Sequence, residues 1–139
     1  MRLSYRVAAA LVIVATIMAG AAGPASAHHS FAMYEPTKEL TLKGAVKTFQ
    51  WTNPHVTLWV LVQPEDGGAA QEWSLETTSP GALTRAGWTR RSVKAGDRVS
   101  VTFSPLRDGS HGGQLKTVTL LDTGQTFVAS RGKEEPELK

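Results

Sequence analysis

The 139-residue chain contains no cysteine, only two tyrosines and only four histidines. Without cysteine it can form no disulfide, no thiolate metal site and no lipid-modified N-terminal cysteine. The G-x-S-x-G and H-E-x-x-H motifs of hydrolases and metalloproteases are also absent. We therefore assign no catalytic residue and expect a binding protein rather than an enzyme, in which histidine would hold any metal.

One long hydrophobic run is present, at the N-terminus. Arg2 and Arg6 precede or flank the start of an uncharged apolar run over residues 7–22, and Ala25-Ser26-Ala27 offers the small residues that signal peptidase accepts. The pattern predicts a signal peptide over residues 1–27, cleaved after Ala27, and hence a periplasmic or secreted protein with no stable membrane insertion after cleavage. A retained anchor is the alternative, which Pro24 disfavours because it shortens the apolar helix below about 20 residues.

The charge balance of the expected mature chain is nearly even. Removal of Arg2 and Arg6 leaves 13 basic residues (15 − 2) against 12 acidic ones, a net charge of +1. Such a balance gives no reason to expect nucleic acid or anionic membranes as partners. The mature chain of 112 residues (139 − 27) is long enough for one domain with a modest core.

Hydrophobic periodicity predicts a mainly β fold with one short helix. Alternating or β-branched runs predict strands over six segments: 40–46, 56–62, 72–78, 98–104, 114–121 and 126–129. The phase slips at Lys47-Thr48, which indicates a β-bulge. Ser79, Pro80 and Gly87 are the cap, first-turn and end residues of a helix of about two turns.

This order of elements is the order found in an OB-fold. We therefore predict a small five- to six-stranded OB-like barrel with one short helix between strands three and four, and keep a small open β-sandwich as the alternative. The expected organisation is a signal peptide over 1–27, an N-terminal arm over 28–39 and the barrel over 40–130. Residues 131–139 are charged and lack aromatics, so we expect a disordered tail.

Four sequence motifs carry a resemblance to a known family. They are AHHSF at the expected cleavage site, WTNPH at 51–55, SPGALTRAGW at 79–88 and KAGDRVSV at 94–101. In these motifs the chain resembles a family of small exported bacterial proteins that is classed only as a domain of unknown function. The resemblance implies export and a single β-rich domain, and it implies no activity.

Two adjacent histidines open the expected mature chain. The free α-amine of His28 and its own Nδ1 can chelate one metal ion, because both titrate near neutral pH. His29 offers a second chelate, through the amine, a backbone amide nitrogen and its imidazole. Copper(II) favours such nitrogen-rich sets. The first arrangement is similar to the histidine brace of copper oxygenases and of periplasmic copper carriers, which is an analogy of site and not of fold.

The other two histidines fall in predicted loops. On an OB-like layout, His55 lies between strands one and two and His111 between strands four and five, on the rim where OB-folds bind ligands. We therefore predict a site for copper(II) or another divalent metal formed by His28, His29, His55 and His111. Redox or oxygen chemistry at such a metal would need an open coordination position, which the sequence does not show.

The predicted arm limits this site. Strand one is expected to start at the end of the barrel opposite this rim and, at about 11 residues, to span roughly 35 Å. The arm of 12 residues before it covers at most about 43 Å. The N-terminus could therefore reach the rim only if the arm ran back along the barrel almost fully extended. The alternatives are that His28 and His29 only suit processing, that His55 caps a turn, and that His111 is an exposed loop residue.

Two other clusters could bind ligands. One cluster predicts a metal-independent interaction surface for a protein, a glycan or a small ligand, and consists of Trp51, Asn53 and Trp59. Exposure of both indoles on an open face near His55 would favour ligand binding, and burial would count against it. A second cluster, of three arginines near Trp88, suits an anion or a sugar, or is a solvated basic patch beside a buried Trp88. The three arginines are Arg85, Arg90 and Arg91.

Overall fold

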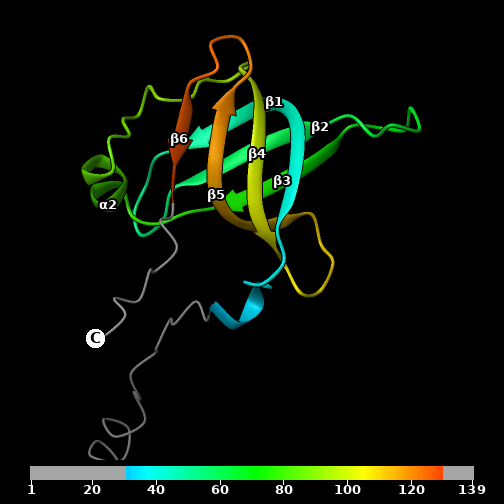
Figure 1. The fold of residues 1–139 in the computed structure, drawn as a ribbon, viewed down its shortest axis with the longest axis horizontal. Helices are drawn as coiled ribbons and strands as arrows, with labels where there is room; N and C mark the ends of the chain where they lie inside the picture. The colour runs from blue at the N-terminus through cyan, green and yellow to red at the C-terminus, as the bar shows by residue number, and fades with distance from the viewer. Residues whose placement is uncertain (1–30, 130–139) are drawn as a thin grey trace, which may run out of the picture. The chain divides into compact units, whose positions relative to one another are not determined.

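A computed structural model describes residues 31–129, and these form a closed β-barrel with one extra strand (Figure 1). The elements are η1, a 3₁₀ helix (Phe31–Met33), β1 (Leu40–Gln50), β2 (Thr57–Val62), β3 (Gln71–Glu76), α2 (Pro80–Arg85), β4 (Arg98–Pro105), β5 (Gly112–Leu120) and β6 (Thr126–Val128). The strand order is β3-β2-β1-β4-β5-β6, and β3 also pairs with β5. This last pairing closes a barrel of five strands and leaves β6 as the extra strand.

The closure confirms the predicted OB-like barrel. The β3–β5 pairing is parallel, whereas the neighbouring pairs in the sheet order are antiparallel. An open sandwich would leave β3 and β5 apart. The short helix α2 lies between strands three and four, as the sequence predicts.

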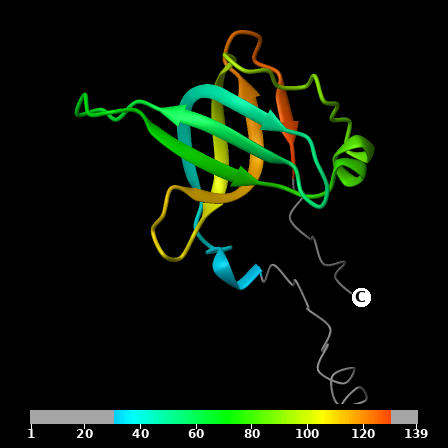
Figure 2. The ribbon, with the colours of Figure 1, turned by 180° about the vertical axis from the view of Figure 1, so that it is seen from behind.

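Strand β1 is long and bent, and it belongs to both halves of the barrel. Its first half pairs with β4 and its second half with β2, with a shift of register between Val46 and Thr48. This shift is the predicted bulge. Figure 2 shows β1 arching over the barrel, so that its two ends are not separated by the length of a straight strand.

Two consecutive glycines permit the closure. A Cβ on Gly113 would lie 2.4 Å from Cδ2 of Phe103 and 2.4 Å from the carbonyl oxygen of Ser104. A Cβ on Gly112 would lie 2.8 Å from Cδ1 of Leu106. The backbone of β5 can pass between β3 and β4 only because these residues have no side chain.

The core is aliphatic and fills the barrel along alternate strand positions. Trp88, at 1% exposure, adds the largest buried side chain, and its Nε1–H donates to the carbonyl oxygen of Val128 at 2.9 Å. The other large, fully buried side chains are those of Val56, Leu58, Val60, Leu75, Leu83, Val93, Val99, Val101, Phe103, Leu115 and Val118. Because the chain has no cysteine, stability rests on this packing.

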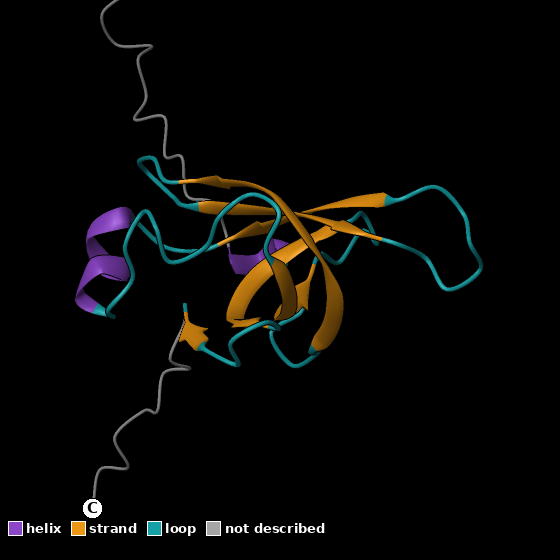
Figure 3. Ribbon diagram, turned by 90° about the horizontal axis from the view of Figure 1, so that it is seen from above, coloured by secondary structure: helices purple, strands orange, loops and turns teal. Residues whose placement is uncertain are grey.

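Helix α2 begins and ends where the sequence predicts. Ser79 is the N-cap, its Oγ accepts from the backbone N–H of Ala82 at 3.3 Å, and Pro80 is the first helical residue. Gly87 follows with φ +92°, a conformation that favours glycine. Figure 3 shows α2 outside the sheet, beyond the strand ends. No helix within residues 31–129 is both long and apolar enough to span a bilayer.

Several predictions fall outside the described residues. The predicted signal peptide and the two histidines of the expected mature N-terminus, His28 and His29, precede residue 31. The predicted tail, residues 131–139, follows residue 129. These remain predictions.

Candidate functional site

The arm that leads into β1 is held against the loop between β4 and β5. Tyr34 forms an isolated antiparallel bridge with Leu106. Arg107 then donates twice, from its backbone N–H to the carbonyl of Met33 at 2.9 Å and from Nε–H to the carbonyl of Ala32 at 2.8 Å. The arm therefore has a defined position from residue 32 onward.

The described part of the arm is not extended along the barrel. An extended return was the condition under which His28 could reach the rim past a straight first strand. Residues 31–33 instead form the 3₁₀ helix η1, and Tyr34 already lies beside the β4–β5 loop. The physical reason is the bend of β1 at its bulge, which a straight-strand estimate of the distance ignores.

One carboxylate joins the arm to a predicted rim histidine. Tyr34 is buried, at 8% exposure, and its hydroxyl donates to Oε2 of Glu76 at 3.4 Å. The other carboxylate oxygen, Oε1, pairs with Nδ1 of His55. Glu76 is the last residue of β3, and His55 belongs to the loop between β1 and β2. Three segments far apart in the sequence thus meet at Glu76.

The electrostatics of this cluster keep the tyrosine neutral. Burial, followed by the charge of Glu76 and the hydrogen bond to it, raises the pKa of Tyr34 to about 12. The phenol is therefore a stable hydrogen-bond donor near neutral pH. Because Nδ1 of His55 is directed at Glu76, metal coordination by this imidazole would use Nε2.

His111 lies in the β4–β5 loop and contacts β3 at a different place. Its ring stacks on Trp73, with 4.7 Å between centroids and 21° between planes. Its carbonyl accepts from the backbone N–H of Ser74 at 3.1 Å. Within residues 31–129, no three His, Cys, Asp or Glu side chains are grouped closely enough to hold a metal ion. His28 and His29, the other two predicted ligands, lie outside this range.

The predicted tryptophan surface is divided between two sides of the barrel wall. Trp51 packs against the core and contacts Phe49, with 5.6 Å between ring centroids. Trp59 alternates with the fully buried Leu58 and Val60, so its half-buried indole stands on the outer face of β2. Asn53 is exposed in the turn after β1. Trp59 and Trp51 therefore do not form one open platform.

Sequence reasoning missed both Tyr34 and Glu76. Glu72 and Glu76 lie on the same face of β3, where strand alternation alone predicts two solvated carboxylates. Glu72 does have this character, since it pairs with the exposed Lys47, whereas Glu76 is half-buried. One available signal was that Tyr34 is the only tyrosine outside the predicted signal peptide.

Comparisons with known proteins identify a family and one structural likeness. A family of unknown function, DUF6152, matches residues 15–116. No curated protein matches the chain. Among solved structures, the chain is similar to the mitochondrial single-stranded DNA binding protein Rim1 from S. cerevisiae, at a TM-score of 0.47 and 14% sequence identity. The match covers 60% of this chain and 93% of that one.

Proposed function

This chain belongs to the family of unknown function DUF6152, and we propose that it is an exported small binding protein that holds copper(II), or a similar divalent metal. The ligands are the mature N-terminus, through the amine and imidazole of His28, and the imidazole of His55. The role is metal carriage or buffering in the periplasm. The single observation that supports the proposal is the Glu76 carboxylate, which contacts both Tyr34 of the arm and His55.

Covalent geometry supports a contribution from the N-terminus. His28 is joined to Phe31 by three peptide units, which span at most about 11 Å. The arm is anchored at residues 32–34, so this short tether limits how far the amine can move from the barrel. The entropic cost of bringing amine and barrel ligands together is correspondingly small.

The donor chemistry suits copper(II). The amine and Nδ1 of His28 and Nε2 of His55 would supply three nitrogen atoms, the type of set that this ion prefers. The contact between Glu76 and Nδ1 of His55 matches the carboxylate–histidine–metal arrangement, in which a carboxylate orients the ring and increases its basicity. His29 offers an alternative chelate at the same end, and His111 a further ligand.

The test is a copper(II) titration of protein that starts at His28, followed by calorimetry and electron spin resonance. The matched control carries one extra alanine before His28, which moves the free amine away from the imidazole. We expect tight one-to-one binding that the extra alanine weakens by orders of magnitude, with several nitrogen ligands in the spectrum. Weak and equal binding by both proteins would refute the proposal.

A metal-independent interaction module is the second candidate. The observation that favours it is the outer face of β2, where half-buried Trp59 and Leu61, at 37% exposure, project on the same side. Such a face suits an apolar or sugar surface. The test follows the Trp59 indole N–H by NMR while soluble oligosaccharides are added to metal-free protein. A saturable shift that Trp59→Leu abolishes would favour this candidate, and no shift would count against glycans as its ligands.

A further inference from the structure

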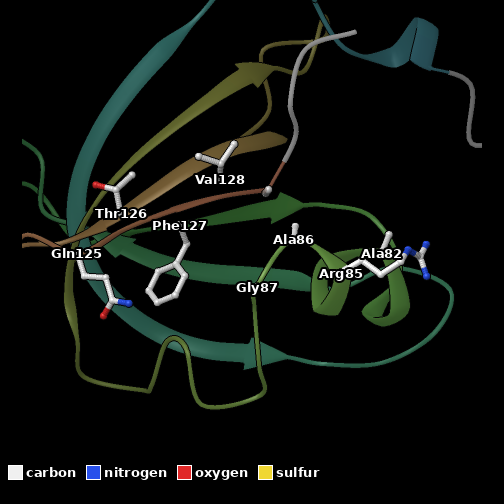
Figure 4. A pocket seen from close by; sticks show the side chains of 9 residues that line it. Ala82, Arg85, Ala86, Gly87, Gln125, Thr126, Phe127 and Val128 are labelled. Carbon is white, nitrogen blue, oxygen red and sulfur yellow. The ribbon is translucent and has the colours of Figure 1, made fainter.

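A groove lies between helix α2 and strand β6, at the end of the barrel that α2 covers (Figure 4). Its larger hollow has a volume of about 710 Å³ and is lined by Ala82, Arg85, Ala86, Gly87, Gln125, Thr126, Phe127, Val128 and Ala129. A second hollow of about 420 Å³ shares Gly87, Gln125 and Phe127 with the first. We call the two together the α2–β6 groove. The larger hollow has the size of a small-molecule site.

The groove is positively charged on its rim. Arg85 lines the larger hollow, and Arg91 and Lys94 line the smaller one. Within residues 31–129, none of these three cations has a carboxylate within ion-pair distance. The one acidic residue of the lining, Asp97, already accepts the backbone N–H of Lys94 at 2.8 Å. The surplus positive charge favours an anion.

The wall of the groove is apolar and aromatic. Figure 4 shows Phe127 of β6 and the preceding residue, Gln125, projecting toward the loop that follows α2, while Thr126 and Val128 project to the other side. The ring of Phe127 is held by Trp88, with 5.1 Å between centroids. The groove therefore combines a flat aromatic ring, an amide and cations that have no carboxylate partner among residues 31–129.

The buried state of Trp88 settles which aromatic residue faces the arginines. The sequence suggested Trp88 as a stacking surface beside Arg85, Arg90 and Arg91. At 1% exposure Trp88 cannot contact a ligand, and its indole N–H is satisfied by Val128. Phe127, which lies about 40 residues further along the chain and is only half-buried, takes that position.

We propose that the α2–β6 groove binds a small organic anion with a flat apolar body, such as an aryl carboxylate. The ring of the ligand packs against Phe127, and its carboxylate contacts Arg91 or Arg85. This site is independent of the proposed metal ligands, none of which lines the groove.

The experiment titrates the full mature chain with phenylacetate and follows the amide and indole N–H resonances by NMR. Phenylacetamide tests the need for charge, and acetate tests the need for the ring. We expect phenylacetate to shift the Trp88 indole N–H and the amides of 125–129 saturably, and the two controls to bind at least about fivefold more weakly. Equal binding of phenylacetate and phenylacetamide would overturn the proposal.

Variants locate the contact without disturbing the core. Arg91→Gln changes an exposed side chain, and we expect it to weaken phenylacetate binding by about threefold to fivefold. Lys43→Gln removes another exposed cation, on β1, that does not line the groove, and it should leave binding unchanged. Equal losses in both variants would show a general charge effect and overturn the proposal.

The acidic tail of this chain is the competing occupant. Glu134, Glu135 and Glu137 follow shortly after Ala129, which lines the groove. Replacing all three by glutamine in the full chain should leave phenylacetate affinity unchanged within about twofold. A much tighter affinity in that variant would show that the tail fills the groove, which would also overturn the assignment to an external anion.

Discussion

The hydroxyl of Tyr34 donates to Oε2 of Glu76 at 3.4 Å, across 42 positions of sequence. This long hydrogen bond joins the arm to the end of β3, and the same carboxylate pairs with His55. The position of the arm is therefore linked physically to the orientation of the rim histidine. This link has three measurable consequences.

The first consequence is the titration of Tyr34, the only tyrosine in a chain that starts at residue 28. We expect absorbance at alkaline pH to report a pKa of about 12 in the folded protein, against the ordinary value of 10.0. Because the folded state favours the neutral phenol, stability should fall as the pH rises from about 10 to 12. Glu76→Gln should lower this pKa only in part, since burial is the larger cause. A pKa near 10 in the folded protein would contradict the buried contact.

The second consequence is a positioning role for Glu76. Glu76→Gln should lower copper(II) affinity by about tenfold to a hundredfold, the usual effect of losing a carboxylate behind a metal-binding histidine. In metal-free protein the same change should alter the His55 tautomer, because the Glu76 carboxylate beside Nδ1 favours a proton on that nitrogen. Long-range nitrogen–proton NMR spectra of the ring measure this tautomer directly.

The matched control for this experiment is Glu72→Gln. Glu72 lies on the same face of β3 but pairs with the exposed Lys47. The Glu72→Gln variant should change neither the His55 tautomer nor the copper(II) affinity. If wild-type protein binds no copper but Glu76→Gln still changes the tautomer, the contact stands and the metal proposal fails. If Glu76→Gln changes neither quantity, Glu76 has no positioning role.

The fold was more predictable than the site, for a physical reason. Period-two alternation and the Ser79 cap are local patterns, so the strands, the bulge at residue 47 and helix α2 were all readable from short windows. Contacts across the barrel have no such local pattern. The Tyr34–Glu76 contact and the placement of Phe127 beside the arginines depend on chain closure, which only the three-dimensional structure shows.

The separation of the two tryptophans shows the same limit. Trp51 and Trp59 are both large aromatic residues near the β1–β2 loop, and residue type alone does not tell which of them is exposed. Strand alternation alone places Trp59 outside the barrel, because its neighbours Leu58 and Val60 face inward. Trp51 follows the end of β1, where alternation no longer applies, and its packing on Phe49 had to be observed.

Barrel closure can be tested through Gly113. We expect Gly113→Ala to destabilise the protein by about 2 kcal/mol or more, because the new Cβ would overlap Phe103 and the Ser104 backbone. Chemical denaturation measures the change. The control is Gly81→Ala in α2, where the nearest atom is Arg85 Nη1 at 3.7 Å and alanine is a better helix former. A neutral Gly113→Ala variant would mean that β5 can move away from β4 without loss.

The third consequence of the arm contact concerns Arg107, whose Nε–H donates to the carbonyl of Ala32. Arg107→Gln removes this side-chain donor but keeps the backbone bond to Met33, so global stability should change by less than about 0.5 kcal/mol. Amide exchange in the arm should become faster, because one of its anchors is lost. Copper(II) affinity should fall as well if the arm delivers the N-terminal amine to the site.

Arg98→Gln is the control, because Arg98 pairs with Asp122, at the opposite end of β4 from the arm contact. It should change neither arm exchange nor copper affinity. Faster arm exchange with unchanged copper affinity would separate the two proposals. The arm would then be anchored as described, but its position would not matter for metal binding, and the N-terminal amine would have to act without help from the barrel.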